Sequence, residues 1–198
     1  MPRIYRWLIS FCLVVGMPAL QATEHAFKVG VQIGVVVPTS PDLKLTTGSP
    51  SGAVGFHLDL PMTDFLAIRP RLDAQFFGQG QQHSQDTTLD QTLKTRVSTL
   101  GIGADALVPL VGLAKSMRVG ISIQELRWQV ASVNTVRILT GGTSEVSGTS
   151  TWWRFAWGPV VAFQVNDQLE IEGRLSLSRY GQENQPANTA AIGVLWHF

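Results

Sequence analysis

The sequence predicts an all-β chain that folds as an eight-stranded antiparallel up-and-down transmembrane β-barrel. Three observations support this prediction. Apolar and polar residues alternate with a period of two in eight segments, and the connections between these segments alternate between long and short. Only 15% of the 198 residues are charged, whereas a soluble domain typically has about 25%. No stretch after residue 22 has the ~20 consecutive apolar residues that a spanning helix needs, so this chain would have to cross a membrane with strands.

Each predicted strand places apolar side chains on one face and polar or small ones on the other. In 27–37, for example, Phe27 and Val29 alternate with Lys28 and Gly30. The eight segments are 27–37, 54–60, 65–77, 100–108, 117–124, 151–165, 169–179 and 190–198. A tilted strand needs roughly 9–11 residues to cross a bilayer, and most of these segments approach or exceed that length.

The connections differ in length and composition. They run over 38–50, 61–64, 78–93, 109–115, 131–150, 166–168 and 181–188. The short ones, such as PMTD and NDQ, consist of turn residues, and the long ones are rich in Gly, Ser, Thr and Gln. Alternate connections of a meander lie at the same end. We therefore expect short periplasmic turns at one end and long outer loops, including 78–93 and 131–150, at the other.

The first 22 residues are typical of a secretory signal peptide. Arg3 and Arg6 precede an apolar stretch that ends near Pro18, and we expect cleavage before Thr23. The barrel would then span 23–198. Cys12, the one cysteine, lies in the removed segment, so the mature chain has no thiol for a disulfide or metal site. Without Arg3 and Arg6 the charge is 13 basic against 14 acidic residues, which gives no footprint for nucleic acid.

Alternation alone does not decide which face of the barrel is apolar, because a soluble barrel of the lipocalin type has the same period with its apolar side inward. Two features favour an apolar outer face. The polar face is rich in glycine, which suits the narrow interior of an eight-stranded barrel. Aromatic residues also gather toward the strand ends, as at the two interfaces of a membrane. These residues are Phe27, Phe76, Trp153, Phe155, Phe163, Trp196 and Phe198.

Three positions do not fit a regular closed sheet. Pro70 and Pro159 lie inside predicted strands, where a missing N–H interrupts a ladder, and bulges would accommodate them. After Gln124 the alternation changes phase, so that Leu126 and Trp128 fall on the formerly polar side. Either a bulge near Glu125 or emergence of the strand from the bilayer would explain this change.

The polar face also carries charged side chains that would point into the lumen. A narrow, poorly hydrated lumen tolerates charges only where they are paired and hydrogen-bonded. The predicted lumen charge network consists of Lys28, Asp59, Arg69, Arg71, Asp73, Asp105, Arg118, Arg154, Glu170, Glu172 and Arg174. We expect these six basic and five acidic residues to form a structural plug; a gated ion path through rearranging pairs is the alternative.

The sequence offers no convincing catalytic or metal site. His83, Ser84, Asp86 and Asp90 lie together in 78–93, but a flexible polar loop does not hold a nucleophile and base in productive geometry. His57 and His197 belong to the lumen face, and no cluster has metal-ligand spacing. We therefore expect no enzymatic activity, no metal and no cofactor.

The final segment, AAIGVLWHF, and the segment LEIEGRLSLSRY carry a family resemblance. Residues 23–198 resemble the small eight-stranded outer-membrane proteins of the OmpX and OmpA-transmembrane-domain type. The resemblance implies an outer-membrane location in a Gram-negative cell, contact with outer-membrane lipid and lipopolysaccharide, and the barrel-assembly machinery as a partner during insertion. It also implies that Trp196 and Phe198 act as the assembly signal. It transfers no catalytic residue.

The expected function is structural, or an interaction at the cell surface in which 78–93 and 131–150 meet an extracellular partner. Two alternatives remain: a narrow porin-like channel for small solutes, and a lipid A-modifying enzyme.

Overall fold

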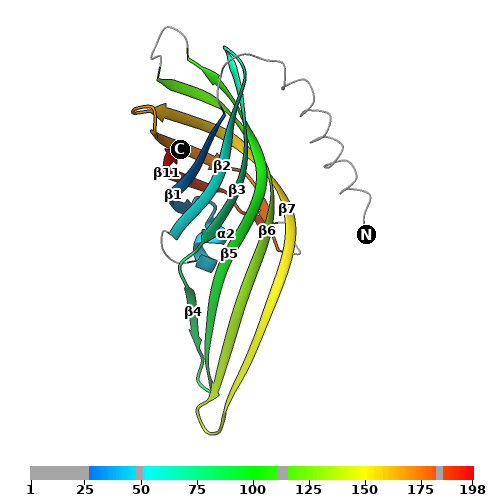
Figure 1. Cartoon of the computed structure of the whole chain (residues 1–198). Coiled ribbons are helices and arrows are strands. Elements are labelled where there is room, and N and C mark those ends of the chain that lie inside the picture. The colour runs from blue at the N-terminus through cyan, green and yellow to red at the C-terminus, as the bar shows by residue number, and fades with distance from the viewer. Residues whose placement is uncertain (1–26, 48–50, 111–115, 182–184) are drawn as a thin grey trace.

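Eight antiparallel strands form a closed ring in the computed structural model, which describes residues 27–47, 51–110, 116–181 and 185–198 (Figure 1). The ring consists of β1 (Lys28–Pro38), β2 (Ser51–Thr63), β3 (Leu66–Phe76), β5 (Leu89–Pro109), β6 (Met117–Ile138), β7 (Thr143–Gln164), β8 (Leu169–Ser176) and β11 (Thr189–His197). Neighbouring strands pair in this order, and β11 returns to pair with β1. The predicted up-and-down barrel is confirmed.

The apolar face of the ring points outward. On β1, Val31, Ile33 and Val35 are exposed, whereas Val36 is buried inside. The same alternation on the other strands leaves large apolar side chains on the outer surface, among them Ile102, Phe155 and Ile192. An outer surface of this kind suits the hydrocarbon of a bilayer, as expected from the sequence. No helix of the described residues is long and apolar enough to cross a membrane.

One end of the barrel continues into a long sheet (Figure 1). The sequence assigned 78–93 and 131–150 to irregular loops, but most of these residues are strand. β4 (Gly80–Gln85) pairs with the start of β5, and β6 and β7 remain paired out to Arg137 and Thr143. We call this four-stranded extension, formed by 80–97, 130–138 and 143–151, the ribbon. The opposite end carries the shorter turns.

The connection between β1 and β2 contains a helix that the alternation pattern could not indicate. α2 (Pro41–Thr47) begins where the amide of Lys44 donates to the carbonyl of Ser40. Its side chains Leu43 and Thr47 are fully buried, and Leu43 packs among residues of β1, β5 and β6 inside the barrel. Two short strands, β9 (Arg179–Tyr180) and β10 (Gln185–Pro186), pair with each other.

The two prolines are accommodated without the bulges that the sequence suggested. Pro70 pairs with Ala104 of β5, and the β2–β3 ladder pauses beside Pro70 and resumes in the same register. Likewise, Pro159 pairs with Ile121 of β6, and the ladder to β8 pauses beside Pro159. Each proline is thus paired with one neighbouring strand only, and on its other side the ladder has no pair that would require its N–H. The register shift between β2 and β3 lies instead between Pro61 and Thr63.

The change of phase after Gln124 is not a bulge either. β6 pairs without interruption with both β5 and β7 through Glu125. Leu126 and Trp128 point inward and are buried, so the lumen itself becomes apolar at this level while the outer face of the strand becomes polar. This arrangement agrees with the second sequence-based explanation, in which the strand leaves the bilayer.

Candidate functional site

A layer of charged side chains fills the lumen toward the end with the shorter turns. Five strands of the ring contribute its carboxylates and guanidinium groups. The members joined by ion pairs are Asp59, Arg69, Arg71, Asp73, Asp105, Arg118, Glu170, Glu172 and Arg174. This charged layer contains five acidic and four basic groups, so its charges nearly cancel.

Arg71 lies at the centre of the charged layer. Its guanidinium donates through Nε to Asp73 Oδ2 at 2.6 Å, and through Nη1 to Asp105 Oδ2 at 2.8 Å and Glu172 Oε1 at 3.0 Å. Arg174 contacts the last two carboxylates as well, at 2.8 and 2.9 Å. Several acceptors surround each planar donor, so every buried guanidinium of the layer has an ion-pair partner. The Nε atoms of Arg69 and Arg174 are buried without an acceptor among the described residues.

Arg69 links this cluster to the neighbouring carboxylates. Its Nη1 lies 2.9 Å from Glu172 Oε2, and its Nη2 lies 2.8 Å from Glu170 Oε1 and 3.0 Å from Asp59 Oδ2. The Arg69 side chain is 0% exposed. Arg118 bridges Asp59 and Glu170 from the short-turn side of the layer, 2.8 Å from Asp59 Oδ2.

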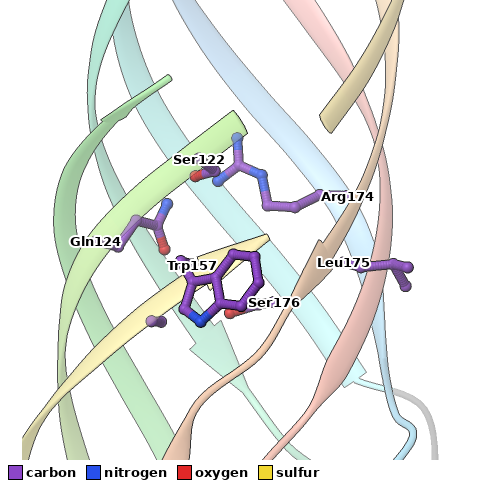
Figure 2. Close-up of a pocket in the computed structure, with 7 residues that line it drawn as sticks. Ser122, Gln124, Trp157, Arg174, Leu175 and Ser176 are labelled. Atoms are coloured by element: carbon purple, nitrogen blue, oxygen red, sulfur yellow. The ribbon is translucent and has the colours of Figure 1, made fainter. Parts of the chain in front are cut away.

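Two glutamines complete the charged layer, and the sequence did not single them out. Gln32 accepts a hydrogen bond from Arg71 at 2.6 Å, and Gln124 donates to Asp73 at 2.7 Å. Both glutamines lie on the polar side of the alternation in their strands, and this position was the one indication in the sequence that they point into the lumen. Figure 2 shows Arg174 pointing inward toward Ser122, with Gln124 nearby and Leu175 turned away from the lumen.

The structure leaves two of the predicted members outside the ion-pair network. Lys28 donates to the main-chain carbonyl of Asp167 at the exposed end of the barrel. Arg154 lies nearer the ribbon, where it pairs across strands with Leu126, and its side chain donates to the carbonyl of Gly181 at 2.6 Å. Both side chains bind main-chain oxygen atoms, which sequence parity cannot foresee.

A cavity of about 120 Å³ lies at the short-turn side of the charged layer, lined in part by Lys28, Asp59, Arg118, Glu170 and His197. Asp59, Glu170 and His197 bring potential metal ligands within 4.8 Å of one another. However, Arg69 and Arg118 already neutralise both carboxylates, so we assign no metal to this cluster. His57 lies beside this cluster, with its Nε2 3.4 Å from Nδ1 of His197.

An apolar core fills the lumen above the charged layer, toward the ribbon. Trp128 stacks on Phe77 with ring centroids 6.0 Å apart and contacts Tyr180 at 5.9 Å. Around these rings pack Val36, Leu43, Val97, Leu126, Ala156 and Ala187. Period-two alternation did not predict this core, although the change of phase after Gln124 was its signal.

The remaining predicted positions lie on the surface. His83 and Ser84 are neighbours on β4, so their side chains point to opposite faces of the sheet. His83 instead faces Asp90, with Nδ1 and Oδ1 3.4 Å apart. Trp196 and Phe198 are exposed on the outer face, and their role as an assembly signal remains a prediction.

Arg71 provides the most direct test of the charged layer. Replacing Arg71 with Met should lower the free energy of unfolding by about 3–5 kcal/mol, because three buried carboxylates would lose a shared partner. Lys28→Met is the matched control and should change stability by less than about 0.5 kcal/mol. Urea titration of the refolded protein in lipid, followed by tryptophan fluorescence, measures both. Equal effects of the two substitutions would contradict a structural role for the network.

No family model and no curated protein matches this sequence. Among solved structures, a major outer membrane protein from Thermus thermophilus is 12% identical with a TM-score of 0.53, over 88% of this chain and 100% of that chain. The N-terminal β-barrel domain of Pseudomonas aeruginosa OprF is 13% identical with a TM-score of 0.46, over 86% and 97%. Ail of Yersinia pestis, crystallised with the heparin analogue sucrose octasulfate, is 11% identical with a TM-score of 0.44, over 88% and 100%.

At these sequence identities the similarity concerns the fold alone. The Thermus structure, whose TM-score exceeds 0.5, supports it. The outer-membrane location expected from the sequence agrees with this fold and with the apolar outer face. The chain has the fold of the small outer-membrane β-barrels, as its resemblance to the OmpX and OmpA type implied.

Proposed function

We propose that this barrel is an outer-membrane surface-interaction protein: its lumen is sealed, and its ribbon binds an extended segment of an extracellular partner. The observation that carries the proposal is the unpaired edge of β7. Over 143–151, β7 is hydrogen-bonded to β6 on one side, and none of the described strands pairs with its other side. With the short turns in the periplasm, the ribbon lies outside the cell.

A sealed lumen disfavours the channel alternative. The charged layer is tied together by ion pairs, and its core members Arg69, Asp105 and Glu172 are at most 1% exposed. The apolar core lies directly above it and is closed by α2 through Leu43. An ion moving through the lumen would therefore have to break several ion pairs and then cross an apolar layer, which is costly in a medium of low dielectric.

The free edge of β7 is well suited to bind another strand. Unpaired N–H and C=O groups at a sheet edge are a template for strand addition, with main-chain hydrogen bonds supplying affinity. Every residue of 143–151 is exposed, and nine residues of strand extend over roughly 30 Å. Proline is absent from this stretch, so each residue has an N–H group.

The faces of the ribbon indicate what kind of segment would bind. The face continuous with the lumen carries no charged residue; it comprises Gly80, Gln82, Ser84, Leu89, Gln91, Leu93, Thr95, Val97, Val130, Ser132, Asn134, Val136, Ile138, Ser144, Val146, Gly148 and Ser150. The opposite face carries Asp90, Lys94, Arg96, Arg137 and Glu145. A partner strand with uncharged side chains on one face and mixed charges on the other would match both surfaces.

The sealed lumen predicts the absence of conductance. The refolded protein in a planar bilayer with 1 M KCl should give no current steps, while a large trimeric porin in the same apparatus provides the positive control. Discrete steps from the wild-type protein would overturn the sealed-lumen proposal and restore the narrow channel.

The free edge predicts where partner peptides bind. Peptides selected from a random library on the nanodisc-embedded protein should lose binding when 132–148 are replaced by Asn-Gly, which joins the paired residues Ala131 and Thr149 by a two-residue turn. The matched control replaces only 138–142 with Asn-Gly, joining Arg137 and Thr143, and leaves the edge intact.

Hydrogen exchange adds a positional measurement to this comparison. Bound peptides should slow exchange of the amides in 143–151. Equal binding to both variants, or protection confined to other strands, would contradict the edge proposal.

A further inference from the structure

Three cationic side chains lie together on the outer surface where the barrel meets the ribbon. Lys94 and Arg96 project outward from β5, and Arg127 projects outward from β6; all three are exposed. None of their side chains makes an ion pair or hydrogen bond with another described residue. We call these three residues the basic patch.

The cross-strand neighbours of the basic patch are uncharged. Lys94 pairs across strands with Val133 and Gln81, and Arg96 pairs with Ala131. Between Arg96 and Arg127 lies the cross-strand pair Ser98 and Gln129, also on the outer face. Arg96 and Arg127 are four residue positions apart along the strands, on the order of 14 Å. Two extended arginine side chains could therefore meet above the hydroxyl and amide of the pair between them.

The patch is positioned at the upper edge of the apolar outer surface. Arg127 pairs on one side with Leu100 and on the other with Trp153, both exposed. Toward the short-turn end, the outer positions become Ile102, Ile123 and Phe155. The aromatic and aliphatic groups belong to the interface and the hydrocarbon, so the basic patch lies at the level of the outer-leaflet headgroups.

Apart from the basic patch, the charged residues on this face of the ribbon are Asp90, Arg137 and Glu145, so the rest of the face has no excess positive charge. Near the tip of the ribbon, Arg137 pairs across strands with Asp90, which also faces His83, and Glu145 pairs with Thr135. On this face of the ribbon and barrel, the cations without an anionic cross-strand partner are therefore those of the basic patch. Glu125 is the acidic group nearest the patch, two positions from Arg127 toward the hydrocarbon, which leaves the group with a net positive charge.

We propose that Lys94, Arg96 and Arg127, with Ser98 and Gln129, form a binding site for a phosphate group of an outer-leaflet glycolipid. Arginine binds phosphate through two parallel N–H donors, and the hydroxyl and amide between the two arginines add donors at the same level. The apolar side chains below them offer a surface for the acyl chains of the same molecule. This site is independent of the free edge of β7.

The experiment measures binding of bis-phosphorylated lipid A to the full chain in phosphatidylcholine nanodiscs. The double variant R96Q/R127Q is compared with K28Q/R137Q, which removes two cations outside the patch, and heat-modifiable gel migration confirms that both fold. Each cation near a membrane surface contributes roughly a fivefold factor, so R96Q/R127Q should weaken binding by about 25-fold. The control should remain within about twofold of wild type.

Two further arms identify the source of the phosphate. Lipid A stripped of its phosphates should bind wild type about as weakly as bis-phosphorylated lipid A binds R96Q/R127Q. Inorganic phosphate at millimolar concentration should not displace the intact lipid. Equal losses in both double variants, undiminished binding of the stripped lipid, or displacement by inorganic phosphate would each overturn the proposal.

Discussion

Lipid hydrocarbon offers no hydrogen-bond partner to a main-chain amide, and the rest of this structure depends on that constraint. A sheet can cross a bilayer only when its edges are joined, so β11 must pair with β1. Closure around eight strands leaves an interior that side chains can just fill. The alternating residues that do not face lipid therefore have to pack against one another in a narrow lumen.

The lumen meets this requirement in two ways at two levels. In the charged layer, each guanidinium has several carboxylate acceptors, and Arg71 alone contacts three. In the apolar core, rings and aliphatic side chains pack around Trp128, and α2 supplies Leu43 from a connection rather than from the ring. Both arrangements fill the interior, so the surface available for recognition is on the outside.

The need for closure ends where the strands leave the bilayer. Water can satisfy main-chain groups there, and β4, β5, β6 and β7 continue as an open sheet whose edge strands are β4 and β7. The free edge and the basic patch thus both result from the passage of the strands out of the bilayer. The first lies beyond the membrane where the ring opens, and the second marks the headgroup level where the outer face changes from apolar to charged.

The sequence predicted those parts of the fold that follow from period-two alternation. It placed all eight ring strands and identified the nine charged residues that the structure joins by ion pairs. It missed the ribbon, because strands exposed on both faces, such as 143–151, show no apolar alternation and have the Ser, Thr and Gly content of a loop. It missed the apolar core because Leu126 and Trp128 invert the pattern. It could not foresee that Lys28 and Arg154 bind main-chain carbonyls, since such contacts depend on where other segments lie.

The inverted polarity of the barrel is the central claim, and its tryptophans allow a direct measurement. Trp157 is exposed on the outer face, whereas Trp128 is 1% exposed inside the lumen. Single-tryptophan variants that retain one or the other, with Phe at the remaining positions, can be refolded into bilayers of brominated phosphatidylcholine. Bromine should strongly quench the fluorescence of the Trp157 variant and leave that of the Trp128 variant nearly unchanged. Equal quenching, or quenching of Trp128 alone, would contradict a lipid-facing apolar surface around a sealed lumen.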